Sequence, residues 1–308
     1  MRAQLERFLL APAAARPFAA LRIGLAAALL GQALQVAPMF LAFYHHGGLL
    51  RGSLMDAFAP THLPPLGRLA PTLAIDGAME SLVLIVCGLL YVGSLVSMLV
   101  GWRTRAVTCS AWLLHWVFTS LAPHTNYGVD AFASVYLFYL LWAPAGAALS
   151  LDRRAGRASD RPRESSRLLL RVMQVHLCVA YLFSGVEKAS GEQWRDGEAI
   201  WRSLTTQGYG AFDFTWLAQV PLLAVLAGWS VLVVEIGYPP FIWPRRTRRL
   251  WIAAVVAMHA GIGIFMGLHV FAAVMIVLTV SLFGVSAEPD ARDQSAQQST
   301  PRAGSLAT

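Results

Sequence analysis

The residues best suited to chemistry lie together at the end of an apolar segment, between Tyr181 and Ile200. The run reads YLFSGVEKASGEQWRDGEAI, so a lysine follows an apolar helix and precedes an acidic stretch with a tryptophan. A free lysine is charged at neutral pH, so it acts as a base only where its surroundings favour the neutral amine. We therefore expect Lys188 to be either a general base or a helix anchor whose ammonium group reaches the membrane interface.

Two further ionisable residues, Glu235 and His259, lie inside separate apolar segments. An ionisable group at membrane depth is costly and by default indicates a functional site. If 222–243 and 250–266 form a hairpin closed by 244–249, both residues lie about 12–14 Å from the same membrane face. We expect a hydrogen bond between them, either as a tie between helices or as a part of substrate or proton handling.

Other polar residues in apolar segments have simpler expected roles. Arg22 and Arg171 lie within about one turn of a helix end, from where their guanidinium groups can reach the interface. His115 and His176 are single histidines in apolar helices, and we expect either packing or interhelical hydrogen bonds from them. The three cysteines show no CxxC or metal-ligand spacing, so we interpret them as packing thiols.

The elements that must position these residues are helices in a membrane. The 308-residue chain is 56% hydrophobic and only 13% charged, with a mean hydropathy of +0.55, whereas a soluble domain carries about 25% charged residues. Apolar runs long enough to cross a bilayer recur along it. We predict an all-α integral membrane protein, a polytopic bundle of about eight transmembrane helices. The predicted spans are 18–44, 81–100, 106–122, 130–149, 168–185, 222–243, 250–266 and 270–284.

The positive residues predict the topology. Most Lys and Arg residues fall in every second connection between the spans, and such residues are retained on the cytoplasmic side. We therefore expect a multi-pass protein of the cell inner (plasma) membrane with both termini cytoplasmic, and with the loops 45–80, 123–129 and 186–221 facing outward. The net charge of +7 then reflects topology, and no nucleic-acid partner is expected.

The domain organisation follows from these spans. Residues 1–17 are predicted to be an uncleaved cytoplasmic segment, 18–284 a single transmembrane domain and 285–308 a disordered cytoplasmic tail. The last two spans are short and meet at 267–269, so a re-entrant pair is an alternative to two full crossings.

One outward loop, 186–221, is rich in aromatic residues. Trp194 and Trp201 are seven residues apart, and Trp201 and Leu204 are three apart, which are spacings of one helix face. We predict a short amphipathic helix in the headgroup region, with acidic residues such as Asp196 on its polar face. The aromatic side chains form either a membrane-interface belt or the lining of an entry for a flat, lipid-soluble ligand.

The chain resembles the HTTM (horizontally transferred transmembrane) domain family, which includes the membrane domain of vitamin K-dependent γ-carboxylase. The carboxylase run has a Tyr, two residues, Ala-Gly-Val-Lys-Lys, and then Trp and Gly. The matching residues here are Tyr181, Ser184-Gly185-Val186-Glu187-Lys188 and Trp194-Arg195-Asp196-Gly197. Supporting similarities are Arg22 with Gly24, Pro144, Ser150-Leu151-Asp152, Glu235 and His259.

The resemblance implies a specific chemistry. In the carboxylase a lysine deprotonates reduced vitamin K, which reacts with oxygen to give a strong base that removes a glutamate γ-proton before CO2 is added. Lys188 matches that lysine, Glu187 replaces the lysine before it, and His124 is matched to a histidine that stabilises the carbanion. The implied cofactor is a reduced quinone; we expect no metal and no nucleotide. The implied substrate-binding residues are Tyr181, Asn126, Glu187, Trp194 and Asp196.

Three functions are compatible with these residues. The first is a quinone- and oxygen-dependent enzyme that modifies a peptide or small substrate at the outer membrane face; since few residues follow the last span, no propeptide-binding portion is expected. The second is a non-enzymatic membrane partner in the maturation, export or immunity of a secreted peptide. The third is a proton-coupled transporter that uses Glu235 and His259.

Overall fold

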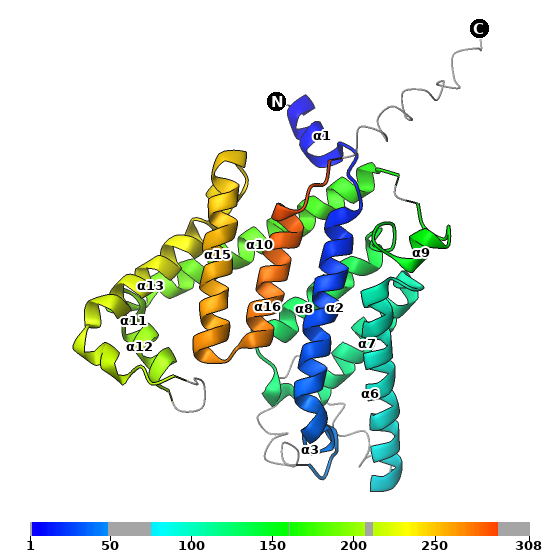
Figure 1. The fold of residues 1–308 in the computed structure, drawn as a ribbon, viewed down its shortest axis with the longest axis horizontal. Helices are drawn as coiled ribbons and strands as arrows, with labels where there is room; N and C mark the ends of the chain where they lie inside the picture. Colours follow the sequence, from blue (N-terminus) through cyan, green and yellow to red (C-terminus); the bar gives the residue numbers. More distant parts are fainter. Residues whose placement is uncertain (1, 49–74, 160, 207–211, 289–308) are drawn as a thin grey trace.

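The computed structural model describes residues 2–48, 75–159, 161–206 and 212–288, and in these ranges the regular structure is helical (Figure 1). An isolated antiparallel bridge joins Ala13 to Arg163. The helices are α1 (Arg2–Leu10), α2 (Arg16–Val36), η1 (Ala37–Met39), α3 (Phe40–Tyr44), α6 (Gly77–Val100), α7 (Thr104–Leu121), η3 (Pro123–Thr125), α8 (Gly128–Trp142), α9 (Leu151–Arg154), α10 (Glu164–Ser190), α11 (Glu192–Arg195), α12 (Glu198–Thr205), η4 (Thr215–Gln219), α13 (Pro221–Ile236), α14 (Tyr238–Ile242), α15 (Arg245–Met266), α16 (His269–Thr279) and the π-helical turn η5 (Val280–Gly284).

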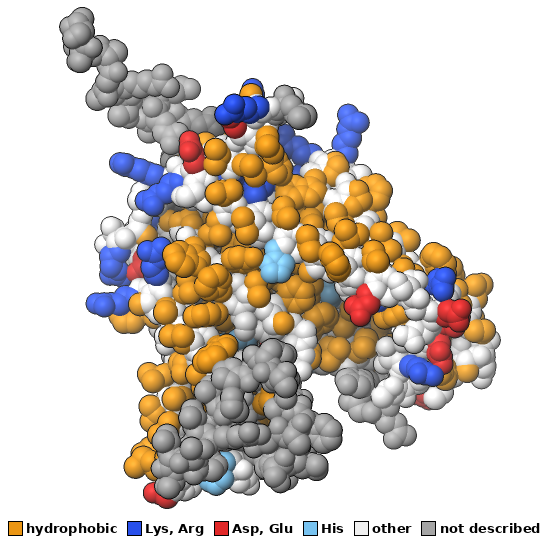
Figure 2. Space-filling model, turned by 180° about the vertical axis from the view of Figure 1, so that it is seen from behind, with side chains coloured by type: hydrophobic (Ala, Val, Ile, Leu, Met, Phe, Trp, Pro, Cys, Tyr) orange, Lys and Arg blue, Asp and Glu red, His pale blue; other side chains and the backbone are white. Residues whose placement is uncertain are grey.

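Four helical segments are long and apolar enough to cross a membrane: Arg16–Tyr44, Gly77–Val100, Glu164–Ser190 and Arg245–Met266. The apolar helices α8, α13 and the run His269–Gly284 are shorter. In Figure 2 hydrophobic side chains cover the middle of the molecule, and most Lys and Arg side chains lie toward the end that carries α1 and α9. The structure is therefore that of an integral membrane protein, while eight full crossings and the side on which each loop lies stay predictions.

Proline residues explain where helix ends differ from the predicted spans. The span 18–44 is interrupted by η1, which contains Pro38. Helix α8 ends at Trp142, well before 149, because Pro144 disfavours the helical conformation of the residue before it. Two prolines in Tyr238–Ile242 likewise follow the end of α13.

The centre of the bundle is α2. Its side chains Leu21, Leu25 and Leu29 are fully buried, and the helix lies between α16 and α6 (Figure 1). A Cβ atom at Gly24 would lie 2.6 Å from Val277 Cγ1, so the missing side chain allows α16 to approach α2. This close contact positions the C-terminal hairpin of α15 and α16 against the rest of the bundle.

A buried carboxylate joins two connections at the end of the bundle near α9. Asp152 accepts hydrogen bonds from the backbone N–H of Arg103 (2.9 Å) and Thr104 (2.7 Å), from the Thr104 hydroxyl (2.7 Å) and from Arg157 Nε (2.9 Å). Burial by itself raises the pKa of Asp152, but these hydrogen bonds outweigh it and lower the pKa to about 2. Asp152 thereby fixes the turn between α6 and α7, where Arg103 has a positive φ of 45°.

The two arginines predicted to reach the interface have internal partners instead. Arg22 is fully buried, and its Nη2 donates to the Leu149 carbonyl at 2.6 Å. The interface prediction is wrong for Arg22, because the connection after α8 covers the guanidinium group. Arg171 Nε donates to the Phe8 carbonyl at 3.0 Å, and its guanidinium lies 4.0 Å from the Phe8 ring. Arg171 therefore holds α1 against α10.

Of the two roles predicted for the single histidines of the apolar helices, packing or interhelical hydrogen bonding, the structure shows the hydrogen bonds. His115 Nδ1 lies 3.0 Å from the Tyr91 hydroxyl, and His176 Nδ1 lies 2.9 Å from the Tyr139 hydroxyl.

Candidate functional site

Lys188 lies within α10, which continues to Ser190 although the sequence predicted that the apolar helix ends at residue 185. Its Nζ donates to both carboxylate oxygens of Glu235, at 2.9 and 2.8 Å, and to Ser184 Oγ at 2.5 Å. The side chain of Lys188 is 23% exposed and that of Glu235 only 8%. The amine is therefore held in a three-point contact inside the bundle.

A glycine allows this contact. A Cβ atom at Gly185 would lie 2.9 Å from Glu235 Cβ and 2.9 Å from the backbone nitrogen of Ile236. Because Gly185 has no side chain, α13 approaches α10 closely and brings Glu235 to the helix face that carries Ser184 and Lys188. Residues four apart share a helix face. The sequence SGVEK therefore provides both the glycine that allows α13 to approach and the lysine that contacts Glu235.

A second polar pair lies on the same face of α10, nearer to the middle of the helix. The Tyr181 hydroxyl lies 2.8 Å from His259 Nε2, which comes from α15. The Tyr181 ring also stacks on Tyr238, with 4.1 Å between the ring centroids. The other ring nitrogen of His259, Nδ1, is buried and has no hydrogen-bond partner among the described residues.

The predicted hydrogen bond between Glu235 and His259 is wrong. Each of them contacts α10 instead, Glu235 through Lys188 and His259 through Tyr181. The sequence placed both residues at the same depth of a hairpin, but side chains of α10 are nearer partners: α10 packs against α13, and the Tyr181 hydroxyl reaches His259 on α15. Lys188 and Tyr181 are seven residues apart, so two turns of one helix carry both pairs.

The tryptophan of the predicted site lies next to the amine. Lys188 Nζ lies 5.4 Å from the centroid of the Trp194 ring, a distance at which a cation and an aromatic face attract each other. Trp194 is in α11, and Trp201 is in the separate helix α12. Trp194 therefore does not share the predicted helix with Trp201, because Gly197 adopts a φ of +87° between the two helices. Trp201 and Leu204 do share the short helix α12.

Other predicted site residues lie outside this cluster. Glu187 is exposed, since adjacent residues of a helix point about 100° apart. Asp196 Oδ1 accepts a hydrogen bond from the backbone N–H of Glu198 at 2.9 Å, in the turn before α12. Asn126 Nδ2 donates to the Thr119 carbonyl at 2.8 Å and so closes the end of α7. The backbone of His124 is in η3, but its side chain lies outside the described part of the chain.

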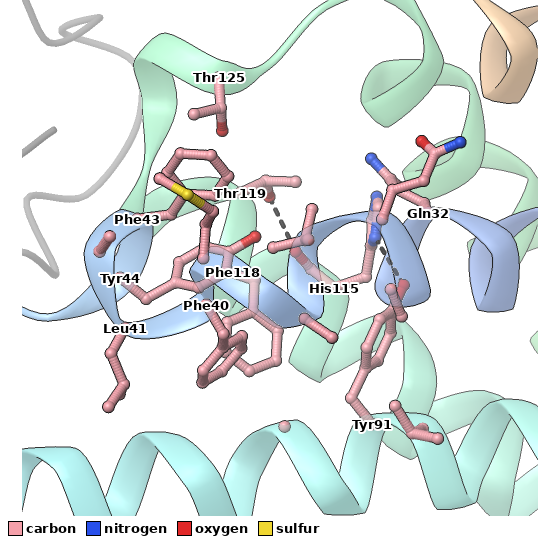
Figure 3. A pocket seen from close by; sticks show the side chains of 18 of the residues that line it. Gln32, Phe40, Leu41, Phe43, Tyr44, Tyr91, His115, Phe118, Thr119 and Thr125 are labelled. Carbon is pink, nitrogen blue, oxygen red and sulfur yellow. Dashed lines mark hydrogen bonds between the residues drawn. The ribbon is translucent and has the colours of Figure 1, made fainter. Parts of the chain in front are cut away.

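A cavity of about 670 Å³ lies elsewhere in the bundle, between α2, α3, α6, α7 and α8 (Figure 3). At one wall Gln32 Nε2 donates to Asp130 Oδ1 at 3.0 Å, and the other wall is aromatic, with Phe40, Tyr44 and Phe118 in ring contact. A cavity of this volume, with one polar and one aromatic wall, is typical of small-molecule sites. Sequence reasoning missed it, although Gln32 and the Asp130 at the start of a predicted span were signals.

The side chain of Phe271 on α16 lies between the two regions. Its ring centroid is 5.5 Å from that of His259 and 6.5 Å from that of Tyr127, which lines the cavity. The rings of Tyr127 and Phe271 thus link the large cavity to the Tyr181–His259 pair.

These features define the class of the protein as a polytopic, all-helical membrane protein with an ion pair inside its helical bundle. Residues 74–286, more than half of the chain, match the family model described as the HTTM domain. The chain belongs to the HTTM domain family.

The sequence is also similar to a curated bacterial protein, "Uncharacterized protein YitO" of Bacillus subtilis (strain 168). The two are 27% identical over 195 residues, which cover 59% of this chain and 61% of the relative. The match thus spans less than two thirds of the relative's own length. No solved structure matches the chain.

Proposed function

We propose that this HTTM protein is a membrane enzyme that modifies a peptide or small substrate in a carboxylase-like reaction dependent on a reduced quinone and oxygen. Lys188 and Glu235 form its proton-transfer centre. The observation that carries the proposal is the contact of Lys188 Nζ with both oxygens of Glu235 and with Ser184 inside the bundle. An intramembrane ion pair is costly to bury and indicates a function.

The carboxylate changes the expected role of the lysine. Lys188 Nζ and the Glu235 carboxylate form an ion pair, so the resting lysine is not a free base. Transfer of one proton from Nζ to a Glu235 oxygen gives a neutral amine and a carboxylic acid, and the amine can then accept a proton from a substrate hydroxyl. The pair acts as one base, with Lys188 in contact with the substrate and Glu235 as the final proton acceptor.

The donor set around this pair suits a hydroxylated ring. Lys188 is partly accessible, His259 Nδ1 is unpartnered among the described residues, and the Phe271 ring lies beside His259. Lys188 would contact a ring hydroxyl, and His259 would orient a second ring oxygen. When bound, a reduced quinone would supply, with oxygen, the strong base that no side chain here provides.

The experiment follows epoxide formation by the purified full chain in nanodiscs with a reduced naphthoquinone and oxygen. We expect epoxide from the wild type, and a loss of about 100-fold or more in Lys188→Ala and Glu235→Gln, as for removal of a general base. Lys188→Arg keeps a charge but cannot supply a neutral amine, so it should be equally inactive.

The matched control is Glu187→Gln, which removes the exposed carboxylate next to the lysine and should leave epoxide formation unchanged. Equal losses in Glu187→Gln and Glu235→Gln would contradict the assignment of Glu235. A wild type that neither binds the quinone nor forms epoxide would overturn the enzymatic proposal and favour a maturation or transport partner.

A further inference from the structure

Three side chains that commonly ligate metals meet at the end of the bundle that carries α3. His45 and His46 directly follow α3, and Glu80 is in the first turn of α6. His45 Nε2 lies 3.4 Å from Glu80 Oε2, and His46 Nδ1 contacts the same oxygen. The three ligand atoms all lie within 4.8 Å of one another.

The backbone positions this cluster. Asp76 caps α6 by accepting a hydrogen bond from the N–H of Met79 at 2.9 Å, so the first turn of the helix and its Glu80 are well defined. The backbone N–H of His46 donates to Glu80 Oε1 at 3.0 Å. The Glu80 carboxylate is therefore held against the turn after α3 by a main-chain hydrogen bond as well as by the imidazoles. Because these groups are already positioned, less conformational entropy is lost when a ligand binds.

We propose that His45, His46 and Glu80 bind a divalent transition-metal ion of the Zn²⁺ class. Two imidazole nitrogens and one carboxylate are the three-ligand set of zinc sites that keep a coordination position open. Ligands bind Zn²⁺ at about 2.0–2.2 Å in a tetrahedral arrangement, which places two of them about 3.4 Å apart. His45 Nε2 and Glu80 Oε2 are 3.4 Å apart, and all three ligand atoms lie within 4.8 Å of one another.

The convergence of two histidines on one oxygen favours a cation over a simple ion pair. Glu80 is 7% exposed, and a single protonated histidine would already compensate its charge. A divalent cation uses all three groups, because it accepts a lone pair from each ring and from the carboxylate. The two rings stack with 4.7 Å between centroids and an interplanar angle of 28°, so they approach Glu80 from the same side.

Without metal, hydrogen bonds occupy both ring nitrogens of His45. His45 Nε2 lies 3.2 Å from the Gly77 carbonyl, and its Nδ1 accepts from the Gly47 N–H at 3.0 Å. Coordination through Nε2 requires the ring proton to move to Nδ1, so metal binding exchanges the hydrogen bonds to Gly77 and from Gly47 for a metal bond. The turn at 45–48 should therefore change conformation when the ion binds.

Space for further ligands adjoins the cluster. A cavity of about 470 Å³ is lined by His45, Gly47 and Ser81, and it shares Leu41 and Ala42 with the larger cavity described above. The open coordination position would accept water or an oxygen of a molecule bound there. This inference does not depend on the proposed reaction at Lys188, so metal binding and epoxide formation can fail separately.

The test uses the full chain without a polyhistidine tag, in nanodiscs and stripped with a chelator. Zn²⁺ is titrated in competition with a chromophoric chelator, and Co²⁺ absorption reports the ligand field. We expect one Zn²⁺ per chain, with affinity weakened at least about tenfold in His45→Ala, His46→Ala and Glu80→Gln. Glu80→Asp keeps a carboxylate and should retain part of the affinity.

The control is His176→Ala, which removes a histidine bonded to Tyr139 away from the cluster and should bind Zn²⁺ like the wild type. Metal-free melting temperatures of all variants separate loss of ligation from loss of folding. A wild type that binds no stoichiometric Zn²⁺ or Co²⁺, or a variant lacking all three ligands that binds as well as the wild type, would overturn the proposal.

Discussion

Lys188 and Glu235 show how strongly one residue's function depends on its partner. The nearest acidic residue in sequence, Glu187, is exposed, whereas the carboxylate that contacts the lysine lies 47 positions away in the chain. Pairing compensates two charges that would each be costly inside the bundle. Stability and activity should therefore respond differently to changes at these two residues.

Removing one partner of the pair should destabilise the protein more than removing both. Glu235→Leu leaves Lys188 without its carboxylate, and we expect a loss of about 3–5 kcal/mol, as for other broken buried pairs. The double variant Lys188→Met/Glu235→Leu should recover most of this loss while staying inactive. Unfolding in detergent measures both, and a double variant no more stable than Glu235→Leu would contradict the prediction.

Acid stability should depend on Asp152. Its pKa of about 2 lies below the ordinary aspartate value of 3.8, so the folded state favours the charged form. Its contribution is fully present above pH 3.8 and is lost as the pH falls toward 2. Asp152→Asn should weaken this pH dependence and cost about 1–3 kcal/mol at neutral pH through lost hydrogen bonds. Melting temperatures between pH 2 and 5 provide the check, and parallel curves for the two proteins would refute it.

At the scale of helices, glycines decide which faces meet. Gly24 and Gly31 both lie in α2, but a Cβ atom would meet Val277 at 2.6 Å in the first case and nothing within 4 Å in the second. The close approach of α16 to α2, and of α13 to α10, therefore depends on single positions rather than on the general apolar character of the helices.

This contrast provides a matched pair of substitutions. Gly24→Ala should destabilise the protein by about 1–3 kcal/mol, because it overpacks the contact with α16. Gly31→Ala should leave stability unchanged or raise it by up to about 1 kcal/mol, because alanine favours the helix. Thermal unfolding of both variants gives the comparison, and equal shifts would exclude the packing explanation.

At the scale of the whole molecule, the arrangement of charges predicts how it lies in the membrane. The arginine-rich connection that includes α9 is at the end of the bundle near α1, and the loop that carries α11 and α12 is displaced toward the opposite end (Figure 1). Positive residues are retained on the cytoplasmic side. We therefore predict that α9 is cytoplasmic and that the end of α10 near Lys188 faces outward.

Cysteine labelling in cells tests this orientation. In a background without the three native cysteines, Ser190→Cys should react with an impermeant thiol reagent in intact cells. Arg154→Cys should react only after permeabilisation; both positions are exposed. The opposite labelling pattern would invert the predicted topology, and with it the side on which the candidate sites lie.

Local patterns in the sequence were sufficient for the helical membrane architecture and the approximate positions of the helices, whereas the role of Lys188 stays a prediction. Hydropathy and helical periodicity depend on neighbouring residues, so they can be identified without a structure. The sequence predicted the ends of α8 and α13 less accurately. These helices end at Trp142 and Ile236 because prolines interrupt segments whose composition stays apolar.

The sequence by itself determined that this chain is an HTTM membrane protein with a lysine at the end of an apolar helix. Only the tertiary structure decided which groups meet: Glu235 with Lys188, Tyr181 with His259, and Glu80 with the histidine pair after α3. The physical reason is that such contacts join residues 34 to 78 positions apart. They depend on how closely two helices approach, which glycines such as Gly185 set through packing rather than through any local pattern.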